Sequence, residues 1–357
     1  MVIKKLDNDD SGYFNLDRFA IRILAEESIS STVSKPYNLD DYPVWLAAKH
    51  ISRQIDLLEF SEAMLSPDSI IFRGFKISSE SIYGEIGNQY LGFFNRFNFF
   101  RRNYLKYKTI KVDKALVITD PWSLINYYHW TIQALPRLSV AATKEDVVLI
   151  LPYSKYRVSD DVIFSTLNAF GFKKNRVIWL EKNQKVKAKK ILMPTNSGES
   201  NHSFKMIKRV SESIKSFYHN HLTFDLGKKI YISRSKACSR RFVNEKDVVN
   251  LLSKNGYVSV NMEEYSFLQQ VSLMSNAQYV VSCHGAGLSN IIFMKKDGFV
   301  LELISEIMMR SHFYYAAAAS GLNYLQQKCK NSDKKYGDNS DIVVDINALE
   351  KNLKLMS

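Results

Sequence analysis

The sequence has little cysteine and no long apolar run. Its three cysteines, Cys238, Cys283 and Cys329, are widely separated and lack metal-ligand spacing, which favours reduced thiols over a disulfide scaffold or a zinc site. No apolar run approaches the ~20 residues that span a bilayer, and residues 1–10 lack the apolar core of a signal peptide. We therefore expect a cytoplasmic protein, and 357 residues are enough for two globular domains.

Several catalytic signatures are also missing. The sequence contains no Gly-x-Ser-x-Gly elbow of ester hydrolases, no Gly-x4-Gly-Lys-Ser/Thr phosphate loop and no His-Glu-x2-His metal helix. Residues 7–9 form an Asp-x-Asp, which another class of transferases uses to hold a metal and a nucleotide. No apolar strand precedes it and it lies near the terminus, so we interpret it as a solvated turn.

Acidic residues are the minority: 49 basic against 36 acidic residues leave a net charge of +13, which favours an anionic partner. Nucleic acid, an acidic membrane surface and phosphorylated small molecules all qualify, but no nucleic-acid-binding motif is visible. Residues 94–108 interleave aromatic and basic side chains. This segment is either a partly buried, solvated loop or helix, or a surface that contacts anionic lipid or a lipid-linked acceptor.

The hydrophobic pattern predicts an α/β fold in two parts. Residues 1–65 are expected to be a mainly helical lead-in with a helix over 42–58, and short strands follow from 69 to 94. From residue 114 strands alternate with helices, which predicts a parallel sheet covered by helices. The polar stretch 195–201 is the candidate linker, after which the alternation begins again.

This pattern predicts domains 1–200 and 201–357, with a ligand cleft between them at the carboxyl ends of the strands. The terminal helix, residues 346–355, is expected to return to the first domain.

A turn rich in small residues follows the apolar strand 279–283. His284-Gly-Ala-Gly287 lets a ligand approach the backbone, and the free amides of the helix that follows favour an anion such as a diphosphate. Asn290 stands where a third glycine would complete a dinucleotide-binding fingerprint. The stretch is therefore either an anion site or a plain structural turn.

Three polar clusters follow predicted strands. His129 lies among aromatics in the cluster 120–137, and it is either a core histidine or a general base, because its unperturbed pKa is about 6.5. Residues 234–241 carry three arginines and a lysine, which either grip phosphates through paired hydrogen bonds or form a solvated basic loop. Glu302 could accept hydrogen bonds from ribose hydroxyls, or it is a capping or ion-paired glutamate.

These pieces together resemble glycosyltransferase family 61. The resemblance covers residues 114–305, and Gln269 departs from it because an acidic residue is common there. It is carried, in order and spacing, by Asn126-Tyr-Tyr-His-Trp130 with Leu135-Pro-Arg137, Ile232-Ser-Arg234 with Arg241-x-x-Asn-Glu245, Glu264-x-Ser-Phe-x-x-Gln270, and His284-Gly-Ala-Gly-Leu-Ser-Asn290.

The resemblance implies an inverting, metal-independent transferase of the GT-B type, with two Rossmann-like domains, no cofactor and a nucleotide sugar in the cleft. A UDP-sugar is the expected donor, and a glycan or lipid-linked glycan the expected acceptor. The implied setting is bacterial capsule, O-antigen or related surface polysaccharide synthesis on the cytoplasmic face of the inner membrane, with peripheral contact to anionic lipid.

The resemblance also implies residue roles. The base is expected to be His129, with Asp120 and Glu264 as alternatives. A non-catalytic nucleotide- or sugar-binding relative and a basic nucleic-acid-binding protein are the competing hypotheses. The acceptor side is expected to comprise Asn126, Tyr128, Trp130 and Arg137, and the donor side Arg234, Arg240, Arg241, Asn244, His284, Gly285, Ala286, Gly287, Asn290 and Glu302.

Overall fold

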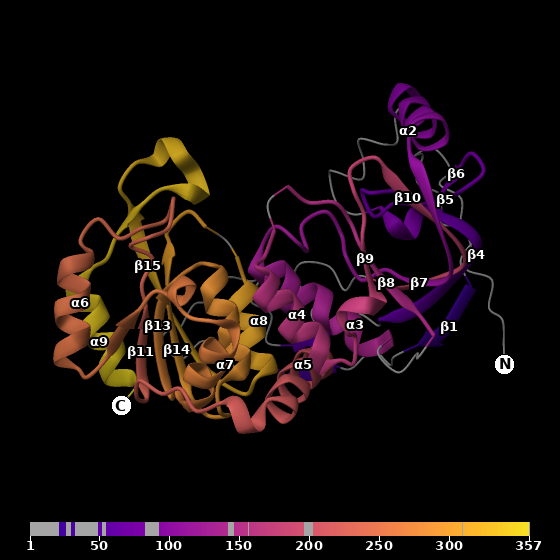
Figure 1. The fold of residues 1–357 in the computed structure, drawn as a ribbon. Coiled ribbons are helices and arrows are strands. Elements are labelled where there is room, and N and C mark those ends of the chain that lie inside the picture. The colour runs from indigo at the N-terminus through magenta and orange to yellow at the C-terminus, as the bar shows by residue number, and fades with distance from the viewer. Residues whose placement is uncertain are drawn as a thin grey trace.

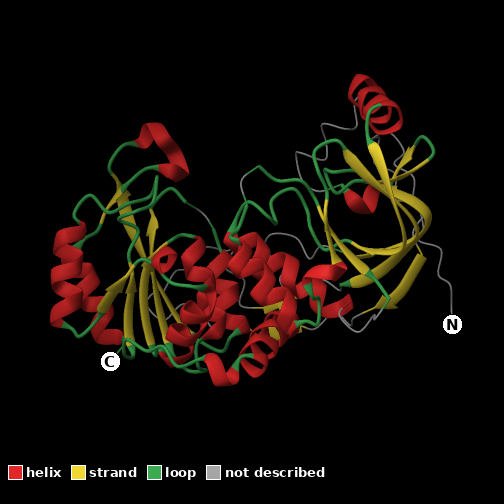
Figure 2. Ribbon diagram, in the orientation of Figure 1, coloured by secondary structure: helices red, strands yellow, loops and turns green. Residues whose placement is uncertain are grey.

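The described residues form two large β-sheets with a layer of helices between them, and a small two-stranded sheet (Figures 1 and 2). The structure is a computed structural model, and it describes residues 21–25, 30–32, 49–51, 55–82, 93–141, 146–155, 157–195, 203–308 and 310–356. The candidate linker 195–201, apart from Thr195, and the Asp-x-Asp at residues 7–9 lie outside the described residues.

The first sheet is mixed rather than parallel. Strands β10, β7, β8 and β9 run parallel, as the alternation of strands and helices predicted, whereas β1, β4, β5 and β6 add antiparallel pairings. Its strands lie in the order β6 (Lys76–Ile77), β5 (Ile71–Arg73), β4 (Asp56–Leu65), β10 (Gln184–Pro194), β7 (Lys108–Leu116), β8 (Val148–Leu151) and β9 (Val177–Trp179), and β1 (Ile21–Ala25) pairs with β4.

The helix predicted over residues 42–58 is wrong where the structure describes it. Strand β3 (Lys49–Ile51) pairs with β2 (Ser30–Thr32), and Asp56 begins the long strand β4. Leu57 and Leu58 are both buried, in different hydrophobic clusters, because the sheet is covered on both faces here. A strand buried on both faces has no alternating pattern, so its continuous apolar run resembles a helix.

The second sheet is a doubly wound parallel sheet. Its order is β12 (Val258–Val260), β11 (Lys229–Ile232), β13 (Tyr279–Cys283), β14 (Phe299–Ser305) and β15 (Asn323–Asn331), with the short β16 (Ile342–Val343) antiparallel at the edge. The first five strands thus follow the order 2-1-3-4-5, in which the direction of winding switches between β11 and β13. Ligands of such sheets bind outside the carboxyl ends of the strands at this switch point.

Helices cover both faces of the second sheet. On the outer face α9 (Ile346–Leu355) packs against α6 (Glu245–Lys254) and β15, and Leu349 and Leu353 are buried there. The terminal helix therefore stays with the second sheet, and the prediction that it returns to the first domain is wrong. On the inner face lie α7 (Phe267–Asn276), the 3₁₀ helix η6 (Ala286–Phe293) and α8 (His312–Ala319).

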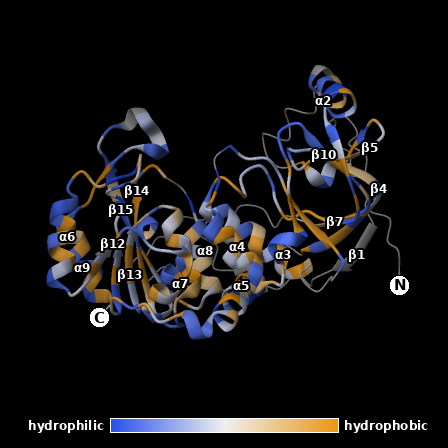
Figure 3. Cartoon of the chain, in the orientation of Figure 1, coloured by the Kyte–Doolittle hydropathy of each residue, from blue (hydrophilic) through white to orange (hydrophobic). Residues whose placement is uncertain are grey.

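The middle layer joins the two sheets. Helix α5 (Phe204–Phe217) packs against α3 (Leu135–Ala141) and α4 (Asp160–Ala169) on one side and against α8 and η6 on the other. One hydrophobic cluster runs from Leu116 and Leu149 of the first sheet through Val210 of α5 to Val280 and Val300 of the second. Figure 3 shows apolar residues on these middle helices. The boundary at residue 200 and the two-Rossmann GT-B arrangement stay predictions.

The sequence also led us to expect reduced thiols and no segment long enough to span a bilayer. Cys283 and Cys329 are buried and free, and burial raises the pKa of both thiols to about 12, while Cys238 is exposed and free. Within the described parts of the chain, no helix has the length and apolar character needed to cross a bilayer.

Candidate active site

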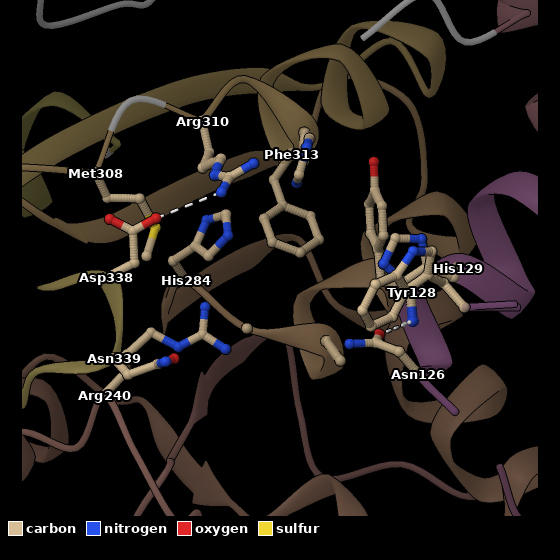
Figure 4. A pocket seen from close by; sticks show the side chains of 14 residues that line it. Asn126, Tyr128, His129, Arg240, His284, Met308, Arg310, Phe313, Asp338 and Asn339 are labelled. Carbon is tan, nitrogen blue, oxygen red and sulfur yellow. Dashed lines mark hydrogen bonds and ion pairs between the residues drawn. The ribbon is translucent and has the colours of Figure 1, made fainter. Parts of the chain in front are cut away.

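A cavity of about 730 Å³ lies where the two parts of the chain meet. Figure 4 shows Asn126, Tyr128 and His129 on one side of it and Arg240, His284 and Arg310 on the other. Asn126 and Tyr128 precede the π-helix η2 (His129–Ala134), His129 begins it, and α3 follows it directly. Arg240, His284 and Arg310 follow strands β11, β13 and β14 of the second sheet. Its lining comprises Trp122, Asn126, Tyr128, His129, Arg240, His284, Gly285, Ala286, Met308, Arg310, His312, Phe313, Asp338 and Asn339.

Arg234 and Gly285 meet at the switch point between β11 and β13. A Cβ on Gly285 would lie 2.0 Å from Nη1 of Arg234, so a side chain at this position would displace the guanidinium. The guanidinium is held in place because its Nη2 donates to the carbonyl of Ser239 (2.9 Å) and its Nε to that of Arg240 (3.3 Å). Arg234 and Gly287 line a separate hollow of about 50 Å³ beside the main cavity. Through its two hydrogen bonds Arg234 stabilises the loop that carries Arg240.

Arg240 is the arginine of this loop that lines the main cavity. Its backbone has φ = 57°, a left-handed conformation that costs a non-glycine residue about 1–3 kcal/mol. Burial, and then the neighbouring guanidinium of Arg234, lower the pKa of Arg240, and its buried Nε has no hydrogen-bond partner among the described residues. A strained, partly desolvated cation facing a cavity is suited to an anionic ligand.

His284 is oriented by a buried carboxylate. Its Nδ1 lies 2.5 Å from Oε1 of Glu302, which is 0% exposed, and Tyr324 donates a hydrogen bond to the other oxygen of Glu302. Burial, and then the charge of Glu302, raise the pKa of Tyr324 well above its usual range, which keeps the phenol a donor. Nδ1 of His284 is thus engaged by Glu302, while the ring lines the cavity.

Glu302 itself does not line the cavity. Its two oxygens contact His284 and Tyr324, so the carboxylate lies behind His284, and its contact with a ribose stays a prediction. In the sequence Glu302 is a single carboxylate within an apolar strand. This pattern does not reveal that His284 and Tyr324 bond to it in the folded protein.

His129 is presented by an unusual helical turn. Residues His129–Ala134 form the π-helix η2, and Pro136 follows in α3. Proline cannot donate to the preceding turn and clashes with the carbonyl four residues back, which favours a wider turn before it. Nδ1 of His129 lies 2.6 Å from Oε1 of Gln133. Because the side chain lines the cavity, Nε2 is the ring nitrogen that can contact a ligand there.

The other residues predicted for the acceptor side divide into two pairs. Asn126 and Tyr128 line the cavity, and Oδ1 of Asn126 accepts from the backbone N–H of Tyr128 at 2.8 Å. Trp130 and Arg137 are buried in the core instead: Trp130 donates to Thr166, and Arg137 donates from Nε to the carbonyl of Pro194. These two residues stabilise the packing of the middle layer and do not contact the cavity.

The two alternative bases lie away from the cavity lining. Oδ1 of Asp120 accepts hydrogen bonds from the backbone N–H groups of Trp122 and Ser123, so it closes the turn before the helix. Glu264 is half-exposed and pairs with Lys236. Neither carboxylate is among the residues that line the cavity, which favours His129 as the base.

Three predicted donor-side residues have structural partners elsewhere. Arg241 is exposed and forms an ion pair with Asp341 at 2.9 Å, and Asn244 bonds both backbone polar groups of Val344. Asn290 is 0% exposed and accepts a 2.5 Å hydrogen bond from the hydroxyl of Tyr127. These residues anchor the segments around the cavity.

Sequence reasoning missed a group of lining residues beyond residue 305. Arg310, His312 and Asp338 follow β14 and β15, and Arg310 pairs with Asp338 at 3.4 Å across the cavity rim. The rule that strand ends converge would have pointed to Arg310, since it follows β14, but the pattern after residue 305 matched no recognisable motif.

A cluster of three or more His, Cys, Asp or Glu side chains arranged to hold a metal is absent from the described residues. The absence of metal from the reaction stays a prediction.

Comparisons with known proteins connect this cavity to a family. Residues 127–301 match the family described as Glycosyltransferase 61, a segment that includes His129, Arg240 and His284. The human protein named "Protein O-linked-mannose beta-1,4-N-acetylglucosaminyltransferase 2" is 29% identical over 97 residues, covering 26% of this chain and 17% of its own length. The Xenopus tropicalis protein of the same name is 33% identical over 82 residues, 22% of this chain and 14% of its own.

The chain therefore matches only about a sixth of the length of the curated relatives. Residues 127–301, slightly less than half of the chain, are therefore similar to Glycosyltransferase 61.

Proposed function

We propose that this protein transfers a sugar, with inversion and without a metal, from a nucleoside-diphosphate sugar to a glycan hydroxyl. The observation that carries the proposal is the division of the cavity in Figure 4, with His129 on one wall and Arg240, His284 and Arg310 on the other. An inverting displacement needs a base and a leaving group on opposite sides of the anomeric carbon, and these two walls supply both.

The wall from the second sheet suits the leaving diphosphate. Arg240 and Arg310 offer guanidinium donors, and Gly285 and Ala286 bring the start of η6 to the cavity. His284, whose Nδ1 is held by Glu302, lines the same wall as these two arginines. Charge stabilisation of this kind supports a mechanism in which side chains take the place of a metal.

On the opposite wall His129 is the proposed base. Its hydrogen bond to Gln133 fixes the ring, and a neutral imidazole can accept the proton of a hydroxyl. The base takes the proton of the acceptor hydroxyl as that oxygen attacks the anomeric carbon. The bond from this carbon to the diphosphate oxygen breaks, and the nucleoside diphosphate leaves with the electron pair.

The identity of the donor and acceptor, the fold type and the biological setting are further parts of this proposal. The expected donor is a UDP-sugar, and N-acetylglucosamine is the first sugar to test because the relatives' name specifies its transfer. The acceptor is a glycan or lipid-linked glycan, and the fold is a GT-B arrangement whose nucleotide domain is the doubly wound sheet. Bacterial capsule or O-antigen synthesis is the setting that the sequence favours, whereas the relatives named above are vertebrate proteins.

The test is release of nucleoside diphosphate from a panel of UDP-sugars in EDTA, with glycan acceptors and with water alone. The wild type should turn over one donor, and NMR of the product should show the inverted anomer. His129→Ala should abolish turnover but retain nucleotide binding, while Arg240→Ala should weaken binding. Arg157→Ala, which removes an arginine that pairs with Asp160 outside the cavity, should leave both unchanged. Nucleotide binding without turnover in any acceptor would mean a non-catalytic relative.

A further inference from the structure

A second surface, remote from the cavity lining, carries exposed apolar and basic side chains together. It is formed by helix α2 (Phe93–Leu105) and the turn between β5 and β6. Figure 1 shows α2 projecting beyond the end of the first sheet, away from the middle layer of helices. We call it the aromatic-basic surface, and it comprises Phe75, Phe97, Arg101, Tyr104, Leu105 and Lys106.

Helix α2 is folded onto the sheet by one face only. Phe99 and Phe100 are buried and pack edge-on against Phe72 of β5. The opposite face stays open, since Phe97 is 60% exposed and Leu105 is 79% exposed. Positions 97, 101, 104 and 105 lie on one side of a helix with 3.6 residues per turn, so these exposed side chains form a continuous stripe.

The β5–β6 turn extends this stripe. Phe75 at its tip is 74% exposed, and its ring lies 5.4 Å from Phe100 and 5.7 Å from Tyr104. The hydroxyl of Tyr104 donates to the carbonyl of Gly74 at 2.7 Å, which fixes the turn against the helix. The exposed aromatics are therefore held by the fold in a defined position.

The charge of this region has one sign. From residue 86 to residue 112 the sequence contains six basic residues and no acidic residue. Arg101 and Lys106 are exposed and flank the apolar side chains of the stripe. Exposed aromatic and aliphatic groups surrounded by cations match a surface that is apolar just beneath a negatively charged layer.

We propose that the aromatic-basic surface docks on an anionic lipid bilayer, inserting Phe75, Phe97 and Leu105 among the acyl chains while Arg101 and Lys106 contact lipid phosphates. This inference is independent of the proposed function, because it concerns binding and not transfer. A second copy of this chain is disfavoured as the occupant, since a two-fold contact would set these cations against each other. Nucleic acid would use the cations but leave Leu105 without an apolar partner.

The test is co-sedimentation of the full chain with vesicles of phosphatidylcholine, with and without phosphatidylglycerol. Binding should require the anionic lipid and fall with salt. Phe97→Ser with Leu105→Ser, and separately Arg101→Glu with Lys106→Glu, should each weaken partitioning at least about ten-fold. Matched controls elsewhere on the surface are Phe217→Ser, at a site 54% exposed, and Lys254→Glu on α6, which should bind as the wild type does.

Circular dichroism and the melting temperature establish that each variant is folded. Three outcomes would overturn the proposal: no preference for anionic vesicles, an equal loss of vesicle binding in the control variants, or normal vesicle binding by the variants of the aromatic-basic surface (the patch variants). If the patch variants instead lose self-association in light scattering, or lose binding to labelled single-stranded DNA, the surface serves a different partner and the lipid assignment fails.

Discussion

Glu302 has no exposed surface, yet it orients His284, which lines the cavity wall formed by the second sheet. It holds Nδ1 of His284, and Tyr324 holds its other oxygen in turn. A carboxylate in this position stabilises a protonated imidazole and fixes its orientation, whereas a neutral amide can do only the second. The contribution of Glu302 is therefore electrostatic as well as geometric.

Glu302→Gln should retain the fold and lower the rate of sugar transfer by about 10- to 100-fold, the range found for carboxylates that orient metal-bound histidines. The substitution preserves size, so cavity formation does not contribute to the loss. Steady-state kinetics with the preferred donor measure the effect, with the melting temperature as the check on folding. Wild-type turnover in the folded variant would show that the charge of Glu302 has no part in the reaction.

Arg240 offers a test of strain stored at a site. Arg240→Gly relieves a left-handed backbone at φ = 57°, so the free energy of unfolding should be maintained or raised, by up to about 1 kcal/mol, while nucleotide affinity falls. The neighbouring Arg241→Gly is the matched control: it breaks the ion pair with Asp341 and should lower stability with little effect on affinity. Urea unfolding and nucleotide titration of both variants check this pair, and a reversed pattern would mean that Arg241 holds the ligand.

The sequence predicted some lining residues and missed others for a physical reason. His129, His284, Gly285 and Arg240 follow recognisable strand-to-turn patterns, and all four line the cavity. Trp130 and Arg137 belong to the same local motif but point into the core, because a motif does not reveal which face of its helix is covered. Arg310 reaches the cavity only through the pairing of β14 with β13.

At the scale of elements, the two parts of the chain are tied by a buried hydrogen bond. The hydroxyl of Tyr127, just before η2, donates to Oδ1 of Asn290 in η6, and Asn290 also donates to Gln270 of α7. Burial raises the pKa of Tyr127 above its usual range, which keeps the donor protonated at any physiological pH. This tie sets η2, and with it His129, against the turn that carries Gly285.

Tyr127→Phe should lower the free energy of unfolding by about 1–3 kcal/mol, since it leaves a buried amide oxygen without its donor. Tyr153→Phe removes a hydroxyl from a side chain 45% exposed, and it should change stability by less than about 0.5 kcal/mol. Urea denaturation of both variants gives the comparison. Equal stability of the two would show that the tie between η2 and η6 is not needed.

The elements of the second sheet were largely predictable and those of the first were not. Strand β11, strand β13 and helix α9 have the predicted bounds, because each has a clear period and local turn signals. Strand β4 was mistaken for part of a helix because both of its faces are buried, and its partner β10 lies more than a hundred residues along the chain. Pairing at that distance leaves no local pattern.

One hydrophobic cluster extends across both large sheets and the helices between them, and smaller clusters lie on the outer faces of the sheets. Domains with separate cores unfold separately, whereas a shared core couples them. Calorimetry should therefore show a single cooperative transition. Two well-separated transitions would mean that the sheets are independent units, as the sequence pattern alone suggested.

The proposed function requires the cavity between the sheets to hold a nucleoside diphosphate through arginines that follow strands of the second sheet. Isothermal titration of UDP, GDP and CMP in EDTA tests it most directly, using the wild type, Arg240→Ala, Arg310→Ala and the Arg157→Ala control. We expect saturable binding of one diphosphate to the wild type and the control, with at least about ten-fold weaker binding in the two cavity variants. Undiminished binding in both cavity variants, or none in the wild type, would contradict it.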